Sequence, residues 1–236
     1  MNDLDGRVIA IAGASGGLGP SVAKRLAGGG ATIAGVDRSE EHLDGLRAEL
    51  DLPDDRFDAR VVDLLAEQAA RDWADHLRDR FGGVDGLLHL VGGWRGGQSL
   101  PETPLSDYEW LHDLLVRTVQ HTTRAFHDAL AASAHGRFVL VSSSQAQSPE
   151  GTNAAYAAAK AAAESWTLAL ADSFKDTAAT ANIIVVNAIL TPRMREEEPD
   201  KPFRCFTSAE QIADAIAFVL SDAAAKMNGK RLSLHP

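Results

Sequence analysis

The stretch "RVIAIAGASGGLG", residues 7–19, decides the fold of this chain. It begins with an apolar run that is typical of a buried strand, and three spaced glycines follow, Gly13, Gly17 and Gly19. Backbone without Cβ atoms can approach a pyrophosphate closely, and the start of the next helix offers free N–H groups and a positive dipole end. A tight structural turn would also use glycines. The stretch therefore predicts a strand–turn–helix unit suited to a dinucleotide, with a purely structural turn as the alternative.

The rest of the chain repeats this alternation of short apolar runs and longer helical patterns. Such a pattern predicts a parallel sheet of about seven strands with helices on both faces, an α/β doubly wound Rossmann-type fold. We expect a single domain, 1–236, because no repeat or linker divides the chain. The predicted strands are 7–12, 31–37, 57–64, 84–93, 136–144, 181–190 and 229–234. The later predicted helices are 39–50, 67–82, 106–133, one that holds Tyr156 and runs to about Lys175, and 208–222.

Serines at the starts of 39–50, 106–133 and 208–222 predict N-caps. The segment 191–207, "TPRMREEEPDKPFRCFT", is the least regular part of the sequence. It follows a strand end, where ligand sites of α/β proteins lie. It is interpreted either as a mobile substrate loop or as a solvated excursion.

Composition excludes several classes of partner. The 236 residues carry a formal net charge of −10, which repels nucleic acid and anionic membranes. The single cysteine, Cys205, cannot form an internal disulfide and is expected to be packed or incidental, which fits a cytoplasmic protein. The start of the chain shows no signal-peptide pattern, and the eight histidines form no spacing typical of a metal site.

An acidic residue ends the second predicted strand, about 20 positions after the glycine turn. The carboxylate of Asp37 can accept hydrogen bonds from the hydroxyls of an adenosine ribose and would repel a 2′-phosphate, which favours NAD over NADP. Arg38 beside it could tolerate that phosphate. Asp63 ends the third strand and can reach the adenine, although a surface carboxylate at a strand end is common.

A second motif, "NAAYAAAK" at 153–160, lies in an alanine-rich helical pattern. Tyr156 and Lys160 are four residues apart and therefore share a helix face. Alone, this spacing fits either a catalytic pair or an ordinary helix. "VSSS" ends the fifth predicted strand, and Ser143 in it precedes Tyr156 by 13 residues.

Together these motifs resemble the classical short-chain dehydrogenases/reductases over nearly the whole chain. The resemblance implies an NAD(P)-dependent oxidoreductase with Ser143, Tyr156 and Lys160 as catalytic residues. It implies a Tyr156 phenol whose pKa is lowered by Lys160 together with the positively charged nicotinamide of the oxidised cofactor, and a Ser143 that holds the substrate oxygen. The implied cofactor-binding residues are Gly13, Ser15, Gly16, Gly17, Leu18, Gly19, Asp37, Arg38, Asp63, Leu64, Gly92, Tyr156, Lys160 and Thr191.

Three positions depart from the family pattern. The Asn-Asn-Ala-Gly turn is replaced by "HLVG", in which only Gly92 is kept and His89 stands at the first position. The asparagine expected seven residues after Trp110 is Arg117, which either disturbs the proton relay or points away. The loop after the sixth strand is short, so that Thr191 is the candidate for the carboxamide contact.

The substrate side is defined only in outline. "VGGW" (91–94) and "TPRMR" (191–195) are similar to the branch that contains dihydropteridine reductase, and no pteridine substrate is inferred from this. Trp94, Gln145 and Met194 are candidate pocket residues for a small alcohol or carbonyl substrate.

The helix 106–133 and the helix that holds Tyr156 are apolar beyond one face, and members of the family pair through these two helices, so a homodimer or homotetramer is expected. A redox sensor or partner-binding protein with little turnover is the alternative function. A nucleotide-sugar epimerase usually needs a larger substrate domain than this chain offers.

Overall fold

The computed structural model describes residues 4–235 and contains a seven-stranded sheet in which every neighbouring pair is parallel. The strand order is β3-β2-β1-β4-β5-β6-β9, which confirms the predicted doubly wound sheet. The strands are β1 (Val8–Ala12), β2 (Thr32–Asp37), β3 (Phe57–Val61), β4 (Gly86–His89), β5 (Arg137–Ser143), β6 (Thr180–Val186) and β9 (Arg231–Ser233).

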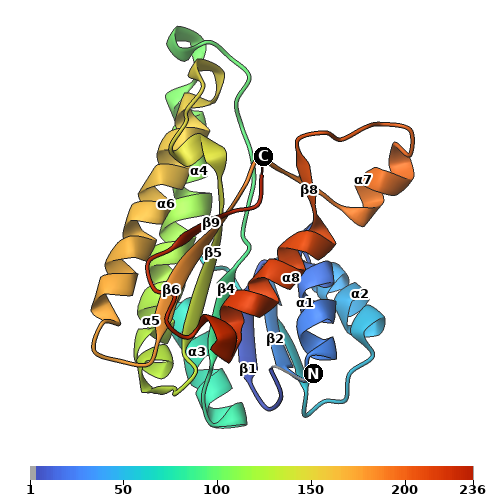
Figure 1. Cartoon of the computed structure of the whole chain (residues 1–236), viewed down its shortest axis with the longest axis vertical. Coiled ribbons are helices and arrows are strands. Elements are labelled where there is room, and N and C mark those ends of the chain that lie inside the picture. Colours follow the sequence, from blue (N-terminus) through green and yellow to red (C-terminus); the bar gives the residue numbers. More distant parts are fainter. Residues whose placement is uncertain (1–3, 236) are drawn as a thin grey trace.

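Helices cover both faces of this sheet (Figure 1). One apolar core lies between the sheet and α1 (Gly19–Gly28), α2 (Glu40–Leu50) and α8 (Ala209–Leu220). The second core lies between the sheet and α3 (Glu67–Phe81), α5 (Thr118–Ala132) and α6 (Ala154–Ser173). Every residue of β1, β5 and β6 is buried, because strands covered on both faces have no solvent side.

The topology creates a ligand crevice at one edge of the sheet. β1 pairs with β2 on one side and with β4 on the other. The chain therefore extends the sheet from β1 first toward β2 and β3, and then in the opposite direction toward β4, β5 and β6. The carboxyl ends of the strands around this switch point are where ligands bind in open α/β sheets. The glycine turn and the ends of β2, β4 and β5 all lie there.

The predicted helix 106–133 forms as one helical run from Leu105 to Ala132, but its serine cap is wrong and a π turn interrupts its α-helical geometry. Its first part, α4, spans Leu105–His112 and is capped by Pro104 without a side-chain hydrogen bond, so the predicted serine cap is absent. A π turn, η2 (Asp113–Arg117), separates α4 from α5, and the N–H of Thr118 donates to the carbonyl of Asp113. The wider turn accommodates one extra residue and changes which side chains face inward. The serine caps of α2 and α8, at Ser39 and Ser208, are confirmed.

The segment 191–207 is more regular than its sequence indicates. It contains α7 (Pro192–Glu197), and Thr191 caps this helix by accepting the N–H of Met194. β7 (Ala188–Leu190) pairs in parallel with β8 (Phe206–Ser208) to form a separate small sheet. The ring of Phe203 is buried against Phe206, which anchors the excursion to that sheet.

The remaining short elements are 3₁₀ turns: η1 (Leu100–Glu102), η3 (Ser144–Ala146), η4 (Gly151–Asn153) and η5 (Asp222–Ala224). Within residues 4–235, no helix has both the length and the apolar character that a bilayer crossing requires.

Candidate active site

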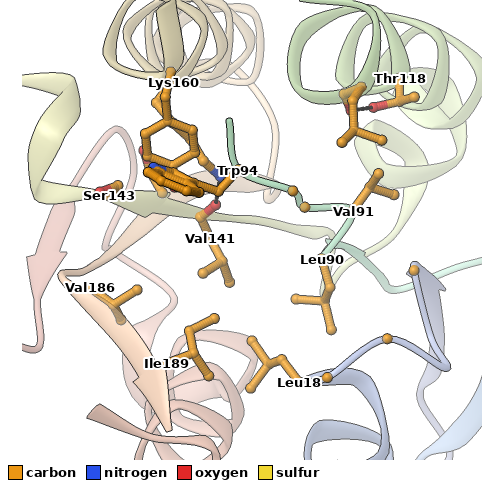
Figure 2. A pocket seen from close by; sticks show the side chains of 18 of the residues that line it. Leu18, Leu90, Val91, Trp94, Thr118, Val141, Ser143, Lys160, Val186 and Ile189 are labelled. Atoms are coloured by element: carbon orange, nitrogen blue, oxygen red, sulfur yellow. Dashed lines mark hydrogen bonds between the residues drawn. The ribbon is translucent and has the colours of Figure 1, made fainter. Parts of the chain in front are cut away.

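A cavity of about 810 Å³ opens at the carboxyl ends of the strands, a volume in the usual range for ligand sites (Figure 2). One end is lined by residues that follow β2 and β3, and the other by residues of β5, β6 and the start of α6. The glycine turn after β1 lies between these ends, as the sheet order requires. We call them the adenosine end and the reaction end.

The glycines of the turn are required by close packing. Gly13 has a φ of +80°, and a Cβ on it would lie 2.9 Å from the backbone nitrogen of Val91. A Cβ on Gly19 would lie 2.0 Å from the carbonyl oxygen of Ala14, so Gly19 is buried in the turn and does not line the cavity. Gly16, Gly17 and the side chain of Leu18 do line it. A bare backbone surface of this kind fits a phosphate-containing ligand.

Ser15 departs from its predicted place, since it does not line the cavity. Its backbone N–H donates to Asp37 Oδ2 at 3.3 Å, which ties the glycine turn to the end of β2. Its hydroxyl is buried without a hydrogen-bond partner among the described residues. An unsatisfied buried hydroxyl in the turn before α1 is consistent with a turn that binds a polar ligand.

Acidic side chains define the adenosine end. Asp37 lines the cavity and also accepts the N–H of Arg38 at 2.7 Å. Asp63 accepts the N–H of Leu65 at 3.0 Å, which fixes its carboxylate at the turn after β3. Arg38 and Leu64 line the same end. The structure thus brings these four predicted residues together around one part of the cavity.

Ser143, Tyr156 and Lys160 all line the reaction end, and Figure 2 labels Ser143 and Lys160 there. Ser143 is the last residue of β5, and its hydroxyl accepts the N–H of Gln145 at 3.3 Å. Tyr156 and Lys160 lie on the first turns of α6, and the Lys160 ammonium is 5.8 Å from the centre of the Tyr156 ring. Lys160 Nζ donates to the carbonyl of Val141 at 3.0 Å, so the amine is held against β5.

Burial dominates the titration of this group of residues. It raises the pKa of Tyr156, and the hydrogen bond with Ser143 opposes the effect only in part. It lowers the pKa of Lys160 to about 8, against the opposing charge of Glu164. The lowering of the Tyr156 pKa that the resemblance implies needs the positive charge of the oxidised nicotinamide as well as Lys160, and the protein alone places the phenol in a site that disfavours the phenolate.

Two of the positions that depart from the family pattern, Arg117 and His89, lie in or beside the π turn and α5. Arg117 is exposed, whereas the next residue, Thr118, lines the cavity. His89 is buried and shares hydrogen bonds with Thr118 Oγ1 at 3.0 Å and Thr122 Oγ1 at 3.2 Å. Burial lowers the pKa of His89 to about 3, with Lys160 adding to the effect, so the imidazole is neutral. Arg117 therefore brings no positive charge to Lys160.

The remaining predicted residues divide into those that reach the cavity and one that does not. Gly92, Trp94, Gln145 and Thr191 line it, whereas Met194 does not and instead donates its N–H to Thr191 Oγ1 at 3.2 Å.

Sequence reasoning missed several lining residues. Those at the reaction end include Leu114, Thr118, Glu150, Asn153, Ala188 and Ile189. Of these residues, only Asn153 belongs to a motif that the sequence analysis singles out, the stretch "NAAYAAAK". In the described part of the chain, no cluster of three or more His, Cys, Asp or Glu could hold a metal ion.

Comparison with known proteins places the chain among relatives of the same length. The family model for short chain dehydrogenases matches residues 7–202. A 3-oxoacyl-(acyl-carrier-protein) reductase from Escherichia coli is 27% identical over 244 residues, covering 99% of this chain and 97% of its own. An uncharacterized oxidoreductase from Staphylococcus epidermidis is 28% identical, covering 94% of each chain.

Solved structures show the same fold. The NADPH-bound structure of a short chain oxidoreductase from Pseudomonas aeruginosa, described as having an atypical catalytic center, superimposes with a TM-score of 0.88. It is 24% identical and covers 96% of this chain and 94% of its own.

Proposed function

The chain belongs to the short-chain dehydrogenase family, and from that premise we propose that it transfers hydride between NAD and a small alcohol or carbonyl compound. The observation that carries the proposal is the convergence of Ser143, Tyr156 and Lys160 at one end of a cavity bordered by the glycine turn. A nicotinamide cofactor would supply the hydride chemistry, and the protein would supply orientation and proton transfer.

The glycine turn would hold the pyrophosphate, with Asp37, Asp63 and Leu64 at the adenosine end. Thr191 lines the cavity beside the glycine turn, since its Cγ2 would lie 3.1 Å from a Cβ on Gly17, and it is the candidate for the contact with the nicotinamide carboxamide. Asp37 supports a preference for NAD, since its carboxylate would repel a 2′-phosphate. Tighter binding of NADPH than of NADH in a side-by-side titration would contradict this preference.

Tyr156 would exchange the proton on the substrate oxygen. Its buried phenol stays protonated at neutral pH without ligands, which suits it to donate a proton to a carbonyl. Ser143 would hold the same oxygen, because its hydroxyl can donate while it accepts from Gln145. Lys160 is fixed one turn away and would stabilise negative charge on the phenol oxygen.

The alternative is a dinucleotide-binding sensor without turnover, which the altered turn at His89 and the short loop before Thr191 motivate. One experiment distinguishes the enzyme from the sensor. NADH consumption is followed with a broad panel of aldehydes and ketones, and NADH affinity is measured by fluorescence in parallel. Turnover of at least one carbonyl supports the enzyme, whereas tight NADH binding without turnover of any compound favours the sensor.

We also propose that the protein forms a homodimer or homotetramer through α4, α5 and α6. Large apolar side chains on these helices are partly exposed, among them Tyr108, Trp110, Trp166 and Leu168. Covering such side chains with a second subunit would remove apolar surface from water. The cytoplasmic location stays a prediction that rests on the single cysteine.

A further inference from the structure

Four residues that line the reaction end of the cavity are linked by hydrogen bonds, and Figure 2 labels one of them, Trp94. The indole N–H of Trp94 donates to Asn153 Oδ1 at 3.2 Å, and Asn153 Nδ2 donates to Glu150 Oε2 at 3.4 Å. The backbone N–H of Glu150 donates to Gln145 Oε1 at 2.9 Å. These contacts orient three polar groups beside the residues that act on the substrate. We call Trp94, Gln145, Glu150 and Asn153 the polar border.

The exposed charge at the reaction end is negative. Among the described lining residues, Asp37, Arg38 and Asp63 belong to the adenosine end, and the Lys160 ammonium is buried against Val141. Glu150 is therefore the charged side chain beside the open part of the reaction end, and it is exposed. A carboxylate or phosphate next to the reacting carbon would be repelled by it and would find no cation of the border to offset the repulsion.

The hydrogen-bonding groups of the border match hydroxyl groups. Glu150 offers carboxylate oxygens as acceptors, and Gln145, whose Oε1 already accepts the N–H of Glu150, offers its amide nitrogen as a donor. A hydroxyl both donates and accepts, so neighbouring hydroxyls can satisfy both groups. A hydrocarbon chain would bury them unpaired. The ring of Trp94 is 59% exposed and its N–H is already bonded, so an apolar surface remains for C–H groups.

We propose that the substrate is a neutral polyhydroxylated alcohol, a polyol or sugar, or the corresponding carbonyl compound. Glu150 and Gln145 bind the hydroxyls next to the reacting carbon, and Trp94 packs against the carbon chain. This inference rests on the proposed oxidoreductase function and narrows its substrate class.

The test uses compounds of matched length with NAD as oxidant. These are the polyols sorbitol and mannitol, the carboxylate gluconate, the amine glucamine and the mono-alcohol 2-hexanol. The kcat/KM of each is measured for the wild type, for Glu150→Ala and for Glu49→Ala, which removes an exposed carboxylate on α2 outside the cavity. Trp94→Ala is measured as a second variant, in case Glu150→Ala alters the folding of its loop.

The wild type is expected to prefer a polyol to 2-hexanol and to gluconate by at least roughly tenfold. Glu150→Ala should lower kcat/KM for the polyol by roughly 10- to 100-fold, the usual effect of removing a charged hydrogen-bond partner, and should leave 2-hexanol nearly unchanged. Trp94→Ala should also act mainly on the polyol, and Glu49→Ala on neither.

Preference for glucamine would overturn the inference in favour of a cationic substrate, and preference for gluconate or 2-hexanol would overturn it outright. In each of these cases the oxidoreductase function survives. Absence of turnover with every alcohol and with the carbonyl panel would overturn both proposals.

Discussion

Replacing Lys160 by methionine is expected to make the protein more stable at neutral pH while removing a group that the reaction needs. Burial lowers the pKa of Lys160 from 10.5 to about 8, so the folded protein holds an ammonium in a site that disfavours it. The free-energy equivalent of this fall is about 3 kcal/mol. Methionine has a similar shape and carries no charge.

The gain is reduced by one lost contact. Lys160 donates a hydrogen bond to the carbonyl of Val141, whose loss costs about 1 kcal/mol. The net expectation for Lys160→Met at pH 7 is a stability increase of about 2 kcal/mol. For a chain of this size that corresponds to a rise in Tm of roughly 4–8 °C.

The pH dependence separates this explanation from improved packing. Between about pH 8 and pH 10.5 the unfolded chain keeps a proton on Lys160 that the folded protein has lost, so wild-type stability should rise with pH in this window. The advantage of Lys160→Met should therefore shrink as pH increases from 7 to 10.5.

Urea unfolding of both proteins at equal concentration, at pH 7 and pH 10, measures this difference. Lys24→Met, at an exposed position on α1, serves as control and should change stability by less than about 0.5 kcal/mol at either pH. A Lys160→Met protein that is less stable than the wild type at pH 7, or whose advantage is the same at both pH values, would refute the reasoning.

Three further predictions concern other parts of the molecule. Gly17→Ala directs a methyl group toward Thr191 and should weaken NADH binding roughly tenfold, about 1.4 kcal/mol. The control Gly45→Ala, on α2 where a Cβ has open space, should leave NADH binding unchanged. Equal NADH affinities of the two variants in a fluorescence titration would argue against the glycine turn as the cofactor site. Asp37→Ser should raise NADPH affinity relative to NADH, and an unchanged ratio would show that Asp37 does not select the cofactor. Asp222→Asn should cost on the order of 1 kcal/mol at pH 7. The hydrogen bond from Arg7 lowers the pKa of Asp222, so this contribution is present above about pH 4 and is lost as pH falls further; a cost that persists at pH 2 would contradict the assignment.

The sheet and its ligand edge could be predicted from the sequence because the evidence is local and redundant. Buried parallel strands are continuous apolar runs, and the glycine turn after β1 marks the edge of the sheet where ligands bind. The adenosine end could be predicted for the same reason, since Asp37 is the last residue of β2 and Asp63 follows β3 by two residues.

The reaction end was less accessible, because side chains reach it through backbone geometry that local patterns do not reveal. The π turn moves Thr118 to the cavity and leaves Arg117 exposed, and counting residues along a regular helix cannot detect that change. Glu150 comes from a loop without periodic signal. The pKa of Tyr156 also depends on burial by segments that are distant in the sequence, and no local pattern reveals that burial.

The central claim is that Tyr156 acts on the substrate proton and is not needed to hold the cofactor. The most direct measurement compares NADH oxidation with a carbonyl substrate, and NADH affinity, in the wild type and in Tyr156→Phe. The account predicts that turnover falls at least about 100-fold, as expected for loss of a general acid, while NADH affinity changes by less than about threefold (0.65 kcal/mol). Turnover close to that of the wild type, or a loss of NADH binding as large as the loss of turnover, would contradict it.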